Sequence, residues 1–479
     1  MSVRTLQPTA LWSHFADLNA VPRPSKDEER VRQFVKGFGE SLGFPTTIDE
    51  VGNVLILKPA TAGMEDRPIV LLQGHIDMVH QKNADTNFDF DTEGIRMIIN
   101  GDWVEADGTT LGADNGIGVA AIMAVLSDKG EIAHPPIEAL FTIDEETGMT
   151  GAIGLKHGVL KAKYMLNLDT EDDRELTIGC AGGIDVTANG TYHAEAARAG
   201  GKGVRLTVRG LSGGHSGMDI IKGLGNANKL LTRLLLHAES NGFSVSKIDG
   251  GGLRNAIPRE AFADLVVDDM SAFEEAIASL KAIITAEYSV TDPSLEIVVE
   301  AIDTPAKNLG AAFQKQLLRA LQATPNGIWR MSPDVEGLVQ TSNNVARVLV
   351  ADGGYEVLCL TRSSVDTEKY DEVASIQSIF ELIGGTISTD GTYPGWTPLP
   401  KSTLLTTMRD LYVKRFNEEP HVNACHAGLE CGIIGEKNPG MEMISFGPNI
   451  TGAHSPDERV QISSVQKFWG YFVEALGAL

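Results

Sequence analysis

A short apolar run that leads into two polar residues constrains the fold of this chain most. Residues 69–79 read Ile-Val-Leu-Leu-Gln-Gly-His-Ile-Asp-Met-Val, so the run brings His75 and Asp77 to its end. Continuous apolar runs of about 4–8 residues are typical of strands covered on both faces, as in a parallel sheet. In open α/β sheets ligands bind at the carboxyl ends of the strands. A lone His-x-Asp pair is more often a core histidine beside a turn aspartate, so its meaning depends on whether the pattern recurs.

The pattern does recur. Four further segments carry a carboxylate or an imidazole at a strand end or in a loop: Asp114, the run Asp144-Glu145-Glu146, Asp169 and His454. Carboxylates crowded into one cleft repel each other unless a cation compensates them. Two imidazoles with several carboxylates suit zinc, cobalt or manganese better than calcium, and thiolates of a closed structural zinc site are missing from this set. The excess of carboxylates over the needs of one tetrahedral ion favours two metal ions.

A dinuclear site of this kind indicates a hydrolase. Two metal ions lower the pKa of a bridging water and polarise a carbonyl, and a carboxylate that is not a ligand must take the proton. Glu145 and Glu146 point differently from an extended backbone, so one can be a ligand and the other the base, but spacing does not decide which. Asp77 lies on the same side as His75 and can orient its imidazole. A non-catalytic metal-binding scaffold is the alternative from another class, although such a scaffold has no need of the second glutamate.

The order of elements predicts an α/β catalytic domain that is discontinuous in sequence. The chain of 479 residues is long enough for two or three domains. Apolar runs and helical patterns alternate up to about residue 170, which indicates a mainly parallel central sheet. The Pro- and Gly-rich stretch Gly391–Pro400 resembles a return linker. We therefore expect a catalytic domain of residues 1–186 and 400–479, with an inserted lid domain of residues 187–399.

The lid domain carries a pattern that repeats. Its order is strand, helix, strand, strand, helix, first over 204–287 and again over 295–383, with Leu295–Ala301 as the opening strand of the second copy. This order predicts an α+β lid of two ferredoxin-like βαββα units. The alternative is that any α+β stretch can be aligned with itself in this way.

The charge composition of the chain limits which kinds of partner it can bind. Forty Lys and Arg residues against 64 Asp and Glu residues give a net charge of −24, and no basic patch or arm is visible. Nucleic acid and anionic membranes are therefore not expected as partners. The start lacks a signal-peptide pattern, no apolar run approaches about 18 residues, and the four cysteines are scattered, so we expect a cytoplasmic protein.

Several motifs together resemble one family, the cytosolic aminoacyl-histidine (Xaa-His) dipeptidases, also called peptidase D, among the co-catalytic di-zinc metallopeptidases. The motifs that carry the resemblance are Gly74–Val79, Gly108–Gly118, Thr142–Gly148, Leu166–Thr170, Gly213–Gly217, Arg254–Pro258, Arg362–Ser364, His426–Glu430 and Gly452–Glu458. The likeness spans nearly the whole chain. It implies a metal-dependent dipeptidase that hydrolyses Xaa-His and related dipeptides of the β-alanyl-histidine type. A deacylase of N-acyl amino acids on the same di-metal core is the alternative within the enzyme class.

The resemblance also implies roles for individual residues. Two Zn²⁺ ions, which Co²⁺ or Mn²⁺ can replace, would be held by His75 and Asp169 on one side and by Glu146 and His454 on the other, with Asp114 bridging. Glu145 would be the general base for attack by a metal-bridging hydroxide, and Asp77 the acid that orients His75.

Further residues are expected to contact the substrate. The resemblance implies that His215 hydrogen-bonds the oxyanion and that Arg362 binds a substrate carboxylate, with Asn255 assisting; His426 and Glu430 are placed near the substrate. A helix-cap histidine, a surface arginine and a turn asparagine are the structural alternatives for the first three. A homodimer is possible. In relatives with a single lid unit a histidine reaches the neighbouring subunit, so the doubled lid suggests that His215 acts within its own chain.

Overall fold

The computed structural model describes residues 2–479 and divides into two compact units. The first, here called the parallel-sheet unit, contains the chain up to Gly179 together with Pro398–Ala424 and Leu429–Leu479. The second, the antiparallel-sheet unit, contains Cys180–Thr397 and Cys425–Gly428. The chain therefore leaves the first unit twice, for the long segment Cys180–Thr397 and for the four residues Cys425–Gly428, and returns to it each time.

The parallel-sheet unit is built on an eight-stranded sheet with the order β1-β2-β6-β3-β7-β23-β8-β22. The central strands run parallel: β3 pairs with β6 and with β7, and β7 pairs with β23. The outer strands β1, β2 and β8 are antiparallel to their inner neighbours. The strands are β1 (Thr46–Ile48), β2 (Val54–Lys58), β3 (Val70–His75), β6 (Ile137–Thr142), β7 (Tyr164–Asn167), β8 (Glu175–Cys180), β22 (His421–Cys425) and β23 (Glu442–Ser445).

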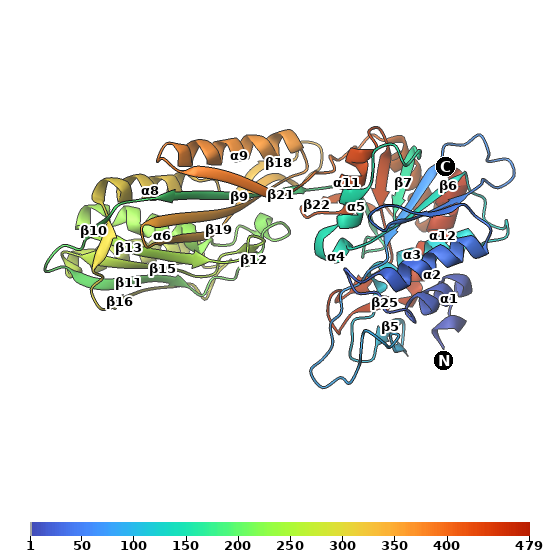
Figure 1. The fold of residues 1–479 in the computed structure, drawn as a ribbon, viewed down its shortest axis with the longest axis horizontal. Coiled ribbons are helices and arrows are strands. Elements are labelled where there is room, and N and C mark those ends of the chain that lie inside the picture. Colours follow the sequence, from blue (N-terminus) through green and yellow to red (C-terminus); the bar gives the residue numbers. More distant parts are fainter. Residues whose placement is uncertain (1) are drawn as a thin grey trace. The chain divides into compact units, whose positions relative to one another are not determined.

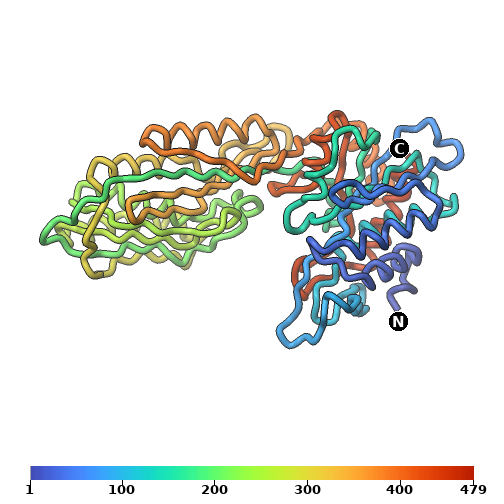
Figure 2. Tube along the Cα trace, viewed as in Figure 1, coloured from blue at the N-terminus to red at the C-terminus, as the bar shows by residue number. Residues whose placement is uncertain are grey.

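Helices flank this sheet, and strands far apart in sequence lie side by side in it (Figures 1 and 2). The helices are α1 (Thr9–Leu18), α2 (Glu29–Ser41), α3 (Ala113–Ser127), α4 (Glu145–Gly148), α5 (Thr150–Gly154), α10 (Thr403–Phe416), α11 (Glu430–Lys437) and α12 (Ile462–Ala478). A separate four-stranded sheet has the order β24-β25-β5-β4, formed by Ile450–Thr451, Arg459–Gln461, Trp103–Ala106 and Met97–Asn100.

Helix α3 packs closely against β3 because small residues allow it. The two glycines at the contact have no room for a side chain: a Cβ at Gly118 would lie 2.5 Å from the carbonyl oxygen of Leu168, and one at Gly74 would lie 2.3 Å from Oδ1 of Asn115. Every residue of β3 is buried. The mainly parallel sheet predicted from the apolar runs is therefore confirmed, with strand β3 beginning one residue later than expected.

The antiparallel-sheet unit is a nine-stranded sheet with helices packed on it in one apolar core. The order is β16-β11-β15-β13-β19-β20-β9-β21, and β18 pairs with β19 beside it. Its strands are β9 (Gly182–Thr191), β11 (Lys202–Arg209), β13 (Phe243–Gly251), β15 (Ala261–Val267), β16 (Glu296–Ala301), β18 (Gly327–Met331), β19 (Val339–Ala351), β20 (Gly354–Ser363) and β21 (Thr386–Tyr393); its helices are α6 (Ala227–His237), α7 (Met270–Glu287), α8 (Ala311–Ala323) and α9 (Asp366–Glu381).

The two halves of this sheet are nested in the chain, which corrects the predicted repeat. The predicted opening strand of the second copy, Leu295–Ala301, is β16, and it pairs with β11 in the first half. The second half instead opens with β9, which pairs with β20 and β21, and the whole first half is inserted between β9 and α8. Figure 2 shows this nesting as a green strand beside an orange one. The predicted strand at 336–341 was also too short, because β19 extends to Ala351 and joins the two halves through β13.

No helix among residues 2–479 combines the length and the apolar character that a membrane crossing requires.

Candidate metal centre

The carboxyl ends of the central parallel strands bring the predicted ligands together. His75 is the last residue of β3, and Asp77 follows two residues later; both side chains are buried. Oδ1 of Asp77 lies 3.3 Å from Nδ1 of His75. The imidazole therefore presents its Nε2 atom to the other acidic residues.

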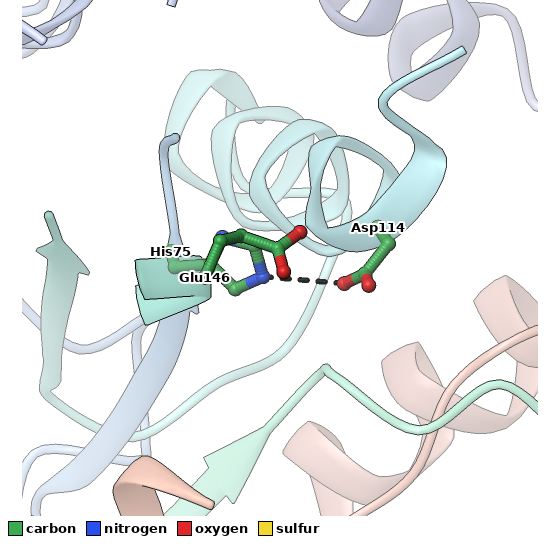
Figure 3. Close-up of side chains that lie close together, drawn as sticks. All are labelled: His75, Asp114 and Glu146. Carbon is green, nitrogen blue, oxygen red and sulfur yellow. Dashed lines mark hydrogen bonds and ion pairs between the residues drawn. The ribbon is translucent and has the colours of Figure 1, made fainter. Parts of the chain in front are cut away.

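Asp114 lies between two imidazoles. Its Oδ1 is 3.2 Å from Nε2 of His75, and its Oδ2 is 3.2 Å from Nε2 of His454. Figure 3 shows Asp114 reaching toward His75 and Glu146 from the start of α3. Because each carboxylate oxygen faces a different histidine, Asp114 has the geometry of a shared ligand.

The turn after β6 supplies both adjacent glutamates. Oε2 of Glu146 lies 2.8 Å from Nε2 of His454. The backbone N–H groups of Glu145 and Glu146 donate to the two oxygens of Asp77, at 3.2 Å and 3.3 Å. Asp77 therefore holds His75 and this turn at the same time.

Asp169 completes the group from the end of β7. Its Oδ1 is 3.5 Å from Nε2 of His75. Burial, opposed by His75 and reinforced by the nearby Asp114 and Glu146, raises the pKa of Asp169 to about 7. Burial also raises the pKa of Glu145 well above its usual value. Carboxylates that cannot all be ionised in this cluster need an added positive charge.

The residues present fit a divalent cation. Ligand atoms of His75, Asp114 and Glu146 all lie within 4.8 Å of one another. Oε1 of Glu146 and Oδ1 of Asp169 are buried and have no hydrogen-bond partner among residues 2–479. Hydrogen bonds to Asp114 and then Glu146 raise the pKa of His454 to about 11, so a proton stabilises this cluster where a metal ion would. Imidazole and carboxylate donors without thiolates are typical of catalytic zinc sites.

His215 lies in the antiparallel-sheet unit with its tautomer set by the backbone. It sits in β12 (Gly214–His215), and its Nδ1 accepts from the N–H groups of Gly217 and Met218 at 3.2 Å and 3.1 Å. Burial, together with Arg362, lowers the pKa of His215. The neutral ring therefore carries its proton on Nε2, where it is available as a donor.

The other predicted contact residues of this unit lie close to His215. Arg362 is buried and donates from Nη1 to the hydroxyl of Tyr393 at 2.8 Å. His426 is buried, and its Nε2 lies 2.7 Å from Oγ of Ser342. Burial and then the charge of Arg362 lower the pKa of His426 to about 3, so the ring is neutral.

Gly217 shows how closely these groups meet. A Cβ at this position would lie 2.2 Å from the carbonyl oxygen of His426, 3.2 Å from Nε of Arg362 and 3.2 Å from Cε1 of His215. Asn255 is exposed, and its carbonyl accepts from the N–H of Ser216, directly beside His215. Four of the residues predicted to contact the substrate are thus gathered in one unit.

Glu430, the fifth of these residues, belongs to the parallel-sheet unit. It opens α11 and is buried, and its Oε2 accepts from Nε2 of Gln73 at 2.7 Å and from Oγ1 of Thr142 at 2.6 Å. Burial raises the pKa of Glu430 to about 8. It therefore joins Gln73 of β3 to Thr142 of β6, and these two residues come two positions before His75 and Asp144 in the chain.

Sequence reasoning did not find three residues that the geometry singles out: Arg23, Tyr393 and Glu458. Tyr393 holds Arg362, and a Cβ at Gly183 would lie 2.7 Å from its ring. Glu458 is the last residue of the motif Gly452–Glu458, but the motif predicts no role for it. No local pattern marks these positions, because Tyr393 lies 31 residues from Arg362, Arg23 lies 89 residues from Gly112, and Glu458 lies 346 residues from Gly112.

Comparison with known proteins places this geometry in context. The pattern of "Peptidase family M20/M25/M40" matches residues 71–477. A cytosol non-specific dipeptidase of Escherichia coli (strain K12) is 44% identical over 474 residues, which cover 98% of each chain.

Solved structures agree with this. The crystal structure of an aminoacylhistidine dipeptidase from Vibrio alginolyticus superimposes with a TM-score of 0.96 at 44% identity, covering 100% of this chain and 98% of that one. The aminopeptidase PepT from Bacillus cereus ATCC 10987 has a TM-score of 0.57 at 15% identity and covers 99% of both chains. At that identity the second likeness concerns the fold alone.

Proposed function

This chain belongs to peptidase family M20/M25/M40, and from that membership we infer that it is a metal-dependent dipeptidase of the aminoacyl-histidine type. The family resemblance drawn from the motifs is confirmed. The observation that carries the inference is Asp114, whose two oxygens face His75 and His454, in a chain 44% identical to two dipeptidases over nearly its whole length. The substrates we propose are Xaa-His dipeptides, including β-alanyl-histidine.

We propose that the centre holds two Zn²⁺ ions, which Co²⁺ or Mn²⁺ can replace. His75 and Asp169 would bind one ion and Glu146 and His454 the other, with Asp114 shared. When bound, the ions supply a Lewis acid for the scissile carbonyl and lower the pKa of water toward neutrality. Oε1 of Glu146, which is buried without a hydrogen-bond partner among residues 2–479, supports this assignment.

Glu145 is the proposed general base. Among residues 2–479 Glu146, and not Glu145, forms an ion pair with His454. Burial raises the pKa of Glu145 well above its usual value, which makes its carboxylate a better proton acceptor. Asp77 accepts the N–H of Glu145, so the same residue that orients His75 also fixes the base.

The antiparallel-sheet unit is proposed to be the lid, built from two ferredoxin-like βαββα units and carrying the substrate contacts. His215 would donate its Nε2 proton to the oxyanion, because its Nδ1 is already occupied by two backbone N–H groups. Arg362 would bind the carboxylate at the C-terminus of the dipeptide. Asn255 and His426 are proposed to line the same place, and Glu430, which joins β3 to β6, to lie near the substrate end of the pocket.

Three further proposals accompany this function. The catalytic domain would comprise 1–186 and 400–479 and the lid 187–399. The protein would act in the cytosol, as the name of its Escherichia coli relative states for that protein. It would form a homodimer.

The test is hydrolysis by protein stripped of metal and then titrated with zinc, cobalt and manganese. We expect β-alanyl-histidine and other dipeptides to be cleaved only after metal is restored, with acetylornithine a poor substrate. Preferential cleavage of acetylornithine, or activity that survives complete removal of metal, would contradict the proposed function.

A further inference from the structure

Glu458 uses one carboxylate to bind four successive backbone N–H groups. Its Oε2 accepts from Leu111 and Gly112 at 2.7 Å and 2.8 Å, and its Oε1 accepts from Ala113 and Asp114 at 2.7 Å and 3.2 Å. The residue is 2% exposed. The first N–H groups of a helix have no acceptor within the helix. At the start of α3 Glu458 provides this acceptor, although it lies more than 340 positions away in the chain.

Arg23 binds the same turn from its carbonyl side. Nη2 of Arg23 donates to the carbonyl of Gly112 at 2.6 Å, and Nη1 donates to the carbonyls of Asp77 and Ile76 at 2.9 Å and 3.2 Å. Arg23 is fully buried. The turn that precedes Asp114 is therefore tied to the segment that follows His75.

Gly112 makes this arrangement possible. Its φ is +70°, and a Cβ there would lie 2.5 Å from Nη2 of Arg23. Only a residue without a side chain lets the guanidinium approach while the backbone stays in the left-handed region.

Glu458 also connects the turn of residues 111–114 to the proposed ligand His454. The segment Gly452–Glu458 also carries His454, whose Nε2 lies 3.2 Å from Oδ2 of Asp114. Within it, the N–H of Ser455 donates to Gly452 and the N–H of Glu458 donates to Ser455, which makes the segment a compact turn. A helix cap alone would account for the bonds to Ala113 and Asp114, the first residues of α3. It would not require the same segment to present a histidine to the side chain of Asp114.

We propose that Glu458 is a positioning residue of the metal centre: by binding the N–H groups of residues 111–114 it fixes Asp114 relative to His454, so that the shared carboxylate meets both ions without rearrangement. Arg23 supports it by holding the opposite side of the same turn. This inference rests on the metal centre of the proposed function. Partners that orient metal ligands typically change metal affinity or activity by about 10–100-fold when they are lost.

The decisive variant is Glu458→Gln, which keeps the shape but replaces one acceptor oxygen by an NH₂ group that faces two N–H donors. Isothermal titration of the metal-free protein with Zn²⁺ should show affinity lowered about 10–100-fold. Activity should be lost at limiting zinc and regained in excess zinc, with the KM for β-alanyl-histidine within about twofold of the parent, because the substrate contacts are unchanged.

Glu138→Gln is the matched control. Glu138 is 5% exposed and likewise accepts backbone N–H groups, from Lys161 and Ala162 at 3.0 Å and 3.1 Å, but it lies at the start of β6, at the other end of the strand from the ligands. Glu138→Gln should lower the Tm by about as much as Glu458→Gln does, but it should leave the zinc affinity unchanged.

The outcomes distinguish a failure of the positioning role of Glu458 from a failure of the proposed metal-dependent function. Equal zinc affinity for Glu458→Gln and the parent would overturn the positioning role and leave a structural cap, whereas a parent that binds no divalent metal would overturn the proposed function itself. If Glu458→Gln does not fold by circular dichroism, Glu458→Asp replaces it: the charge stays but the shorter side chain cannot reach all four N–H groups. Weakened zinc binding in the Asp variant supports the inference, and parental binding contradicts it.

Discussion

Oδ1 of Asp77 lies 3.3 Å from Nδ1 of His75, with both side chains almost completely buried. The other oxygen of Asp77 accepts from Oγ of Ser25 at 2.8 Å. A charged carboxylate in this place fixes the tautomer of His75 so that Nε2 is free to bind a metal ion.

Replacing Asp77 by Asn should therefore weaken metal binding at the centre but not abolish it. The amide can still occupy the space, but it loses the negative charge that makes the imidazole a better ligand. We expect zinc affinity or kcat to fall about 10–100-fold, measured by titration and by hydrolysis of β-alanyl-histidine. Parental values for both quantities would show that His75 needs no such partner.

Glu145 and Glu146 should respond differently to the same substitution. Glu145→Gln removes the proposed base and should lower kcat by about 10²–10⁴-fold, while the bound zinc per chain stays unchanged. Glu146→Gln removes a proposed ligand and should lower the bound zinc. Metal content by atomic absorption, read beside kcat, separates the two roles, and a Glu145→Gln variant as active as the parent would remove the catalytic interpretation.

Glu372 gives the antiparallel-sheet unit a pH-dependent stability. It is fully buried on α9, and neither carboxylate oxygen has a hydrogen-bond partner among residues 2–479. Burial raises its pKa to about 8 from the ordinary 4.5. The folded state therefore keeps a proton that the unfolded state releases, and the free energy of unfolding falls as the pH rises from about 4.5 to about 8.

Glu372→Gln should abolish this contribution, because the amide stays neutral. The Tm of the variant relative to the parent should rise between pH 5 and pH 8 by several degrees, since about 1 kcal/mol corresponds to about 2–4 °C for a unit of this size. Glu381→Gln, an exposed change on the same helix, is the control and should give a constant difference. A Tm difference for Glu372→Gln that does not change with pH would contradict the prediction.

The centre of the fold could be predicted because its signals are local. Strands such as β3 and β6 are mostly apolar and buried at every residue, and polar groups follow at their ends. Parallel strands place those ends at one edge, so the proximity of His75, Asp114 and Glu146 followed from the pattern.

The nesting of the antiparallel sheet could not be predicted, because the local sequence carries no signal for it. Strand β21 is an edge strand exposed along most of its length, and β9 contains three glycines, so neither shows a clear alternation. Nothing in Leu295–Ala301 itself tells whether it pairs with β11 or opens a new repeat. Roles that depend on backbone contacts across hundreds of residues, such as that of Glu458, leave no local trace either.

Tyr393 should tune the proposed carboxylate site through Arg362. Its hydroxyl accepts from Nη1 of Arg362 at 2.8 Å. Tyr393→Phe keeps the ring, which packs against Gly183 and Gly428, and removes only the hydroxyl. We expect the KM for β-alanyl-histidine to rise about 3–10-fold with kcat nearly unchanged, because a hydrogen bond that acts on the substrate only through Arg362 contributes about 1 kcal/mol. The amide of the same dipeptide, which lacks the carboxylate, should show no change in KM. An equal rise for both substrates would assign Tyr393 a general structural role.

His215 is predicted to act within its own chain. The two nested halves of the antiparallel sheet give one chain both His215, in β12 of the first half, and Arg362, in β20 of the second half. Mixing a His215→Ala chain with a Glu145→Ala chain tests this directly. Each variant alone lacks one essential group, so an active site assembled across two subunits would recover up to about a quarter of the parental activity in a randomly mixed dimer. We expect no recovery, with the mixed dimer verified by two different affinity tags, and recovered activity would show that His215 acts from the neighbouring subunit.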